Sequence, residues 1–258
     1  MIKLFANFFW IFTPTWFQKT VSRYFSLFFK TELSRLIILP YCLFYGIDED
    51  YLSRFVSDSG DTTYKSYDDF FNRKYKSFPR AQSQMIWPCE GYVCDWKIVE
   101  SGKSSFIKGD HYELGAVFDV PNDQIENHYF VNVFLHNHNY HRVHAPVDGE
   151  IVSIKRVPGG LVFLRPWFYK RQDVSYPAFK NERVIFEIKD KQNQTWYMAM
   201  IGGFGVGTIK YDDQLKEITK GQEIGRFHLG STVCIASPYQ INNLSYLQKV
   251  SVEQPLDV

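Results

Sequence analysis

The sequence has few cysteines and no long apolar run. Four cysteines are spread over 258 residues, at Cys42, Cys89, Cys94 and Cys234. They form no CxxC pair and no zinc-finger spacing, and they are too sparse for a disulfide framework, so we expect a reducing compartment. No apolar stretch reaches the roughly 18 residues of a membrane span, because Pro14 ends the first run and Pro40 interrupts the second.

The sequence also lacks an excess of either charge. It carries 29 Lys and Arg against 28 Asp and Glu, for a net charge of +1. Nucleic-acid binding usually needs a concentrated basic face, so no nucleic-acid partner is expected. The start, Met1-Ile2-Lys3 followed by aromatics, has no small-residue cleavage site, and we therefore expect no cleaved leader.

What the sequence does have is an aromatic, basic segment at residues 1–46. It holds 14 of the 46 aromatic residues, and five Lys or Arg against the single acid Glu32. Between Trp16 and Lys30 the apolar positions recur at helical spacing, as Phe17, Val21, Tyr24, Phe25 and Phe28. The pattern predicts an amphipathic helix that lies on a membrane surface or, alternatively, packs its apolar stripe on the protein's own core.

Residues 47–258 are predicted to form one catalytic domain. A short helix is expected after Ser66, and from Ile86 onward short runs rich in β-branched and aromatic residues alternate with turn residues. The fold class expected is α+β, with N-terminal membrane-associating helices before a mainly antiparallel body resembling a β-sandwich or barrel. The clearest predicted strands are Tyr129 to Leu135, Gly149 to Val157, Arg183 to Ile188, Thr195 to Ile201 and Thr232 to Ala236.

Four histidines lie within nine residues, at His136, His138, His141 and His144. On a strand, His136 and His138 would share one face and could hold a metal. His141 and His144 could instead supply an acid and a base. A solvated polar loop without a site is a third interpretation, and the spacing alone does not decide among them.

A second chemical element is the Gly230-Ser231-Thr232 tripeptide. Because Gly230 has no side chain, the backbone can bend so that the Ser231 hydroxyl attacks the preceding carbonyl. The acyl shift would give an ester, elimination would give dehydroalanine, and hydrolysis would leave a pyruvoyl group.

These motifs resemble the phosphatidylserine decarboxylase family, and the likeness runs through most of the chain. Its elements follow in the family's order: YDDFFNR at 67–73 with Pro79-Arg80, KGDHYEL at 108–114, YHRVHAP at 140–146, Pro158-Gly159, NER at 181–183, Val206-Gly207 and FHLGSTV at 227–233.

The resemblance implies roles for the candidate residues. Self-cleavage between Gly230 and Ser231 would give a β chain 1–230 and an α chain 231–258, with Ser231 as nucleophile and pyruvoyl precursor. His144 would be the base for self-cleavage, and His141 would serve decarboxylation or substrate binding.

The family's Pro-x-Asp-Gly turn, whose carboxylate orients the histidine base, reads Pro88-Cys89-Glu90-Gly91 here. Glu90 is therefore expected to orient His144, with Asp95 as the less favoured substitute. Glu90 is one methylene longer than Asp, and a misplacement of about 1 Å can cost on the order of a hundredfold in rate.

The implied activity is decarboxylation of phosphatidylserine to phosphatidylethanolamine and CO2 through a Schiff base with the Ser231-derived pyruvoyl group. Neither a metal nor pyridoxal phosphate is needed. The partners expected are phosphatidylserine and the membrane surface, with the two cleaved chains staying associated and a homodimer as a further assembly. The implied location is peripheral, on the cytoplasmic face of the cytoplasmic membrane.

Other readings stay open at this point. They are a metal-dependent β-barrel enzyme using His136 and His138, a non-enzymatic carrier-like module, an unprocessed inactive homologue bound to the membrane because Glu90 replaces Asp, and a pyruvoyl decarboxylase of a soluble amino acid.

Overall fold

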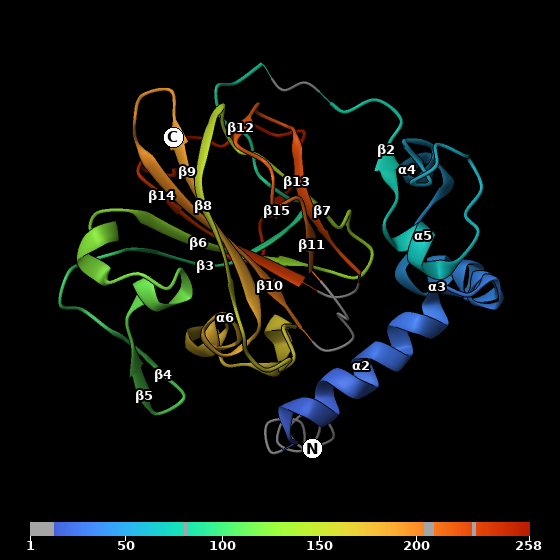
Figure 1. The fold of residues 1–258 in the computed structure, drawn as a ribbon, viewed down its shortest axis with the longest axis horizontal. Coiled ribbons are helices and arrows are strands. Elements are labelled where there is room, and N and C mark those ends of the chain that lie inside the picture. Colours follow the sequence, from blue (N-terminus) through green and yellow to red (C-terminus); the bar gives the residue numbers. More distant parts are fainter. Residues whose placement is uncertain (1–12, 80–81, 204–208, 229–230) are drawn as a thin grey trace.

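The computed structural model describes residues 13–79, 82–203, 209–228 and 231–258 (Figure 1). Helices gather at the N-terminal end and an antiparallel β body follows, which confirms the α+β class. Within these described ranges, no helix has both the length and the apolar character that crossing a membrane requires.

The N-terminal part is a set of short helices around one long one. The predicted helix from Trp16 to Lys30 is confirmed as α2, and the helix expected after Ser66 is confirmed as α5, where the Ser66 hydroxyl accepts the Asp69 N–H as an N-cap. The elements are α2 (Thr15–Phe29), the 3-10 helix η1 (Glu32–Ile37), α3 (Ile38–Tyr45), α4 (Glu49–Ser53), β1 (Phe55–Val56), α5 (Tyr67–Phe71) and β2 (Lys74–Tyr75).

Helix α2 turns its polar side to the protein and its apolar side outward. The buried residues are Gln18, Ser22 and Ser26, whereas Tyr24 and Phe25 are 70% and 48% exposed. The alternative that the apolar stripe packs on the protein's own core is therefore wrong. Gln18 explains part of this helix orientation, because its side-chain carbonyl accepts the N–H of buried Leu161 at 2.9 Å.

A small apolar core joins these helices across the predicted domain boundary at residues 46/47. Cys42 of α3 packs with Tyr67, Phe70 and Phe71 of α5. Ser34 reinforces the junction, because its hydroxyl accepts the N–H of Tyr67 at 2.9 Å. Helix α5 is thereby fixed to the N-terminal helices on one side, and on the other it contacts the β body, where Phe71 stacks on His141.

The body is built on an open eight-stranded sheet in the order β12-β8-β9-β10-β14-β6-β3-β15. All its pairs are antiparallel, and the described edge strands β12 and β15 do not pair, so the sheet is not closed into a barrel. Its strands are β3 (Gly91–Ile98), β6 (Tyr129–Leu135), β8 (Gly149–Val157), β9 (Arg183–Asp190), β10 (Thr195–Gly202), β12 (Glu217–Ile218), β14 (Ser231–Ser237) and β15 (Lys249–Val250).

A three-stranded sheet in the order β11-β13-β7 covers one face of the large sheet. The main core lies between them, with Val143 and Phe227 of the small sheet packed against Leu135 and Val233 of the large one. The small sheet consists of β7 (Arg142–His144), β11 (Ile209–Tyr211) and β13 (Glu223–Phe227).

Short helices and a hairpin accompany the other face of the large sheet, where a second core holds Phe130 and Phe134 of β6. These elements are β4 (Ser105–Ile107), β5 (Asp110–Tyr112), η2 (Leu114–Val117), η3 (Asn122–Ile125), η4 (Pro166–Phe168), η5 (Arg171–Asp173) and α6 (Tyr176–Lys180).

Candidate active site

Ser231 opens strand β14 in the middle of the large sheet. It lies opposite Leu135 of β6 and Gly202 of β10, and it is fully buried. Residues alternate between the faces of a strand, so Ser231 shares the main-core face with Val233. Gly230, the other residue of the predicted cleavage site, lies outside the described residues, as do Arg80 and the Val206-Gly207 motif.

His141 is the histidine that the structure places against Ser231. Its Nδ1 lies 3.0 Å from the Ser231 Oγ, and its Nε2 lies 3.1 Å from the carbonyl oxygen of His136. Since a carbonyl can only accept, Nε2 carries the proton, and in the neutral ring Nδ1 is left as an acceptor. The Ser231 hydroxyl therefore donates to Nδ1, which is the arrangement of a nucleophile and its general base.

The surroundings keep the His141 ring neutral and fixed. Burial lowers its pKa well below the ordinary value, and the positive charge of Arg73 lowers it further. The ring of Phe71, from α5, stacks on it with centroids 4.0 Å apart. A neutral, immobilised imidazole is ready to take a proton from Ser231.

His144 makes its contacts elsewhere. Its Nδ1–H donates to the carbonyl of Gly221 at 2.7 Å, and its Nε2 accepts from the Tyr140 hydroxyl at 2.9 Å. Burial lowers its pKa to about 4. Among the described contacts, His144 therefore reaches neither Ser231 nor Glu90.

Glu90 belongs to a different buried cluster from the one expected. Its carboxylate accepts the Asn139 amide at 2.7 Å and the Tyr51 hydroxyl at 3.0 Å. Glu90 is 3% exposed, so both contacts are shielded from water. The structure thus directs Glu90 toward the turn before His141, and within the residues it describes the Glu90 carboxylate does not accept the expected hydrogen bond from His144.

Arg73 completes this cluster, and the sequence reasoning assigned it no role. The fully buried guanidinium donates to the carbonyls of His138 and Asn139 at 2.7 and 2.9 Å, and to the Tyr51 hydroxyl. It therefore pins the turn that leads into His141. The sequence did contain a signal for this role, because Arg73 is a cation in the YDDFFNR motif, next to aromatic residues that favour burial.

Asp95, the less favoured candidate for orienting His144, also makes its contacts elsewhere. It accepts the Ser175 hydroxyl at 2.8 Å, the Ser175 oxygen accepts Asn132, and the Asn132 carbonyl accepts the Thr232 hydroxyl at 2.6 Å. This buried series of hydrogen bonds ends at Thr232, which follows Ser231 and lies on the opposite face of β14. It supports the strand and does not orient His144.

His136 and His138 lie beyond the end of β6, so the expectation that they share a strand face is wrong. Their rings are nevertheless close, with centroids 4.4 Å apart. Burial lowers the pKa of His136 to about 4. No group of three or more His, Cys, Asp or Glu side chains suited to a metal occurs in the described part of the chain.

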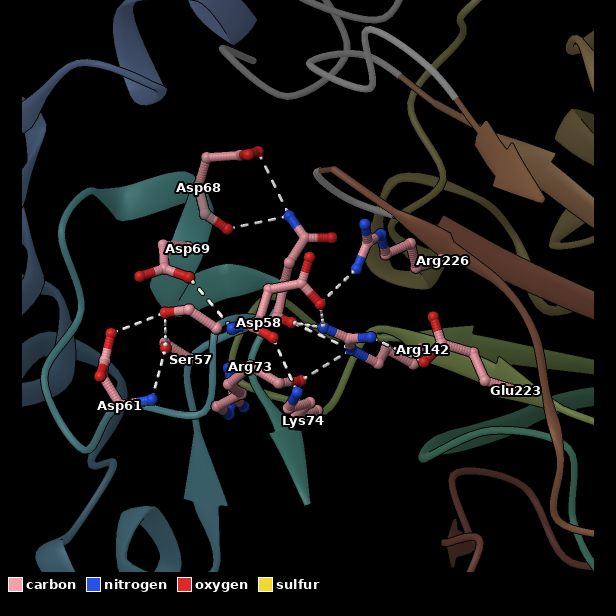
Figure 2. Close-up of polar contacts among 12 residues, drawn as sticks. Ser57, Asp58, Asp61, Asp68, Asp69, Arg73, Lys74, Arg142, Glu223 and Arg226 are labelled. Atoms are coloured by element: carbon pink, nitrogen blue, oxygen red, sulfur yellow. Dashed lines mark hydrogen bonds and ion pairs between the residues drawn. The ribbon is translucent and has the colours of Figure 1, made fainter. Parts of the chain in front are cut away.

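An ion-pair network fastens the helices to the small sheet beside this site. Figure 2 shows Asp58 between Arg142 and Arg226, with Oδ1 at 2.7 and 2.8 Å from their guanidinium nitrogens. Arg142, which is 3% exposed, also contacts Glu223 at 2.6 Å. Strand β7 is therefore held from two sides immediately after His141.

Comparison with known proteins shows the family of the chain. The phosphatidylserine decarboxylase family model matches residues 67–256, which is most of the chain. The chain belongs to the phosphatidylserine decarboxylase family. The match begins at α5 and includes both Ser231 and the four-histidine segment.

Individual members of the phosphatidylserine decarboxylase family also match about two thirds or more of the chain. Three similar relatives, each named phosphatidylserine decarboxylase proenzyme, come from Chromobacterium violaceum, Methylobacillus flagellatus and Legionella pneumophila strain Philadelphia 1. The first is 29% identical over 70% of this chain and 73% of its own. The second is 30% identical over 69% and 71%, and the third is 32% identical over 67% and 69%.

Proposed function

We propose that this chain is a self-processing phosphatidylserine decarboxylase, which forms phosphatidylethanolamine and CO2 with a pyruvoyl group made from its own Ser231. The observation that carries the proposal is the 3.0 Å contact between the Ser231 hydroxyl and Nδ1 of His141. Membership in the decarboxylase family supports the reaction class, and the proenzyme names of the relatives support processing.

His141 takes the hydroxyl proton as the Ser231 oxygen attacks the carbonyl of Gly230. The buried site favours this transfer, since bulk water does not compete for the hydroxyl. The roles implied by the resemblance, with His144 as this base and His141 in decarboxylation, remain the rival assignment. Variants of the two histidines separate the two assignments.

The residues around Ser231 suit the group that it would become. A carbonyl at this position would keep the neutral His141 beside it, in a site closed to water. The pyruvoyl group would supply an electron sink for the departure of CO2. His141 then stands near enough to return a proton to the reacting centre.

The exposed apolar side chains of α2, η1 and α3 support a lipid substrate and a peripheral position on a membrane surface. Leu36, Leu39, Leu43 and Phe44 are each more than two thirds exposed. Large exposed apolar surfaces mark interaction sites, and aromatic and aliphatic side chains enter the headgroup region. Tyr41 of α3 links this surface to the turn before His141, because its hydroxyl donates to the Asn137 carbonyl at 2.6 Å.

Intact mass measurement of the purified protein tests the proposal. Processing predicts a fragment of residues 231–258 that is lighter by one ammonia than the same peptide with N-terminal serine. The mature protein should release CO2 from carboxyl-labelled phosphatidylserine, and the Ser231→Ala variant should do neither. A single uncut chain would indicate the inactive homologue, while turnover of free serine without lipid turnover would indicate a decarboxylase of a soluble amino acid.

A further inference from the structure

A second histidine next to the cleavage segment is held by a carboxylate. His228 follows strand β13, three positions before Ser231, and is 3% exposed. Its Nδ1 donates a short hydrogen bond to Oδ1 of Asp68, on α5. Asn72, one turn further along α5, donates to the same Asp68 oxygen at 3.2 Å.

The other nitrogen of His228 is available for chemistry. Because a carboxylate accepts, Asp68 fixes the proton on Nδ1, so the neutral ring presents a lone pair at Nε2. That Nε2 is buried and has no hydrogen-bond partner within the described structure. A buried polar atom without a partner destabilises the fold, so a functional role is a reason for such an atom to persist.

The pair belongs to the same assembly as the base of Ser231. The N–H of Phe227 donates to the backbone carbonyl of His141 at 3.0 Å, so His228 leaves the small sheet beside that base. Phe71, on the same short helix as Asp68, stacks on the His141 ring. Helix α5 therefore contacts both histidines, and three residues of chain can separate the Cα atoms of His228 and Ser231 by no more than about 11 Å.

We propose that His228, held by Asp68, is the base for the elimination step that follows the acyl shift at Ser231. This rests on the proposed self-processing. His141 serves the first step: the Ser231 proton passes through it to the departing amide nitrogen while the bond from Gly230 to that nitrogen becomes an ester bond to Oγ. The ring of His141 is then restored to its starting state.

Elimination needs another proton to be removed, from Cα of Ser231. His228 Nε2 takes this proton, the Cα=Cβ bond forms, and the Cβ–O bond breaks with its electron pair leaving on the Gly230 carboxylate. The protonated His228 returns the proton to Cβ, which becomes the methyl group. Protonation of Cβ leaves a protonated imine at Cα. Water then replaces the nitrogen there, which leaves as ammonium, and this cation balances the charge of the Gly230 carboxylate.

Trapping the ester separates this role from a structural one. The His228→Asn variant keeps an amide N–H for Asp68 but loses Nε2. It should still form the ester, with pyruvoyl formation slowed on the order of a hundredfold or more. Hydroxylamine, which cleaves esters, should therefore release the 231–258 peptide with N-terminal serine from this variant. Asp68→Asn should show the same accumulation in milder form, and the matched control Asp69→Asn, on the same helix turn, should mature normally.

Three results would overturn the inference. One is normal pyruvoyl formation in His228→Asn, and the second is loss of the ester together with the pyruvoyl group in a variant that still folds by circular dichroism. The third is arrest of Asp69→Asn to the same extent. Failure of the proposed function looks different, because the unaltered chain would then yield neither the pyruvoyl peptide nor a hydroxylamine-sensitive ester.

Discussion

His141 accepts a hydrogen bond from Ser231, and the contact on the opposite side of its ring sets the direction of this bond. The Nε2–H of His141 is committed to a backbone carbonyl, so Nδ1 can only accept the serine hydroxyl. The position of the His141 ring depends on backbone geometry, since a turn carbonyl rather than a carboxylate orients it.

Replacing each of the two histidines should have different effects. His141→Ala removes the acceptor of the Ser231 proton, and we expect self-cleavage to slow by about 10²–10⁴-fold. His144→Ala, which removes contacts to Gly221 and Tyr140, should slow it far less. The measurement is the rate of appearance of the 231–258 peptide, with exposed His111→Ala as control. The opposite ranking would establish His144 as the base.

Shortening Glu90 should impair maturation in this chain. Glu90→Asp withdraws the carboxylate from Asn139 and Tyr51, which loosens the turn before His141. Up to about a hundredfold slower cleavage is expected, as for a displacement of about 1 Å in a catalytic constellation. Exposed Glu126→Asp is the control for the side-chain change. Faster cleavage in Glu90→Asp would instead support an orienting contact with His144 in the reacting state.

Stability should fall as the pH drops from 6.5 toward 4. The pKa of His144 is lowered to about 4 by burial, against about 6.5 in the unfolded chain. The unfolded state therefore binds the extra proton first, and up to about 3 kcal/mol of stability is lost through this window. Urea unfolding of the uncleaved Ser231→Ala chain at several pH values measures the slope, and the added His144→Gln change should flatten it. An unchanged slope would contradict a buried neutral His144.

Asp58 should stabilise the junction between the helices and the small sheet except in strong acid. Burial alone would raise its pKa, but the hydrogen bonds from Arg226 and Arg142 outweigh this and lower the pKa to about 2. Asp58→Asn should therefore lower the urea midpoint above about pH 4, and the difference should vanish as the pH falls through about 2. Neighbouring Asp61→Asn serves as control. Equal effects of the two changes would argue against the Arg142 network.

Removing apolar side chains from α3 should release the protein from lipid. Leu39→Ser and Leu43→Ser together remove two exposed leucines, each worth about 1.5–3 kcal/mol when fully buried, so binding should weaken at least tenfold. Flotation with phosphatidylserine vesicles measures this, and self-cleavage should be unchanged. Ile98→Ser with Val152→Ser, which removes exposed apolar side chains from the β body, is the matched control. Equal loss in both variants would mean that α3 is not the contact surface.

Local patterning predicted much of the fold. The strands Tyr129–Leu135 and Gly149–Val157 have the bounds expected, because β-branched and aromatic residues between turn residues favour extended backbone. Local patterning did not predict which strands pair with each other. That β14 lies between β6 and β10 is settled by contacts between residues about a hundred and about thirty positions apart, respectively, which no local pattern encodes.

The sequence by itself determined the α+β class and the long amphipathic helix, and it singled out Ser231 and the histidine cluster as candidate residues. Helical spacing defines an apolar stripe, but only tertiary packing showed that Gln18 and Ser22 turn inward and the stripe outward. Likewise, His141 and His144 are three residues apart and chemically identical. Only the turn fixed by Arg73 and Glu90, and the strand pairing that buries Ser231, decided which imidazole reaches the hydroxyl.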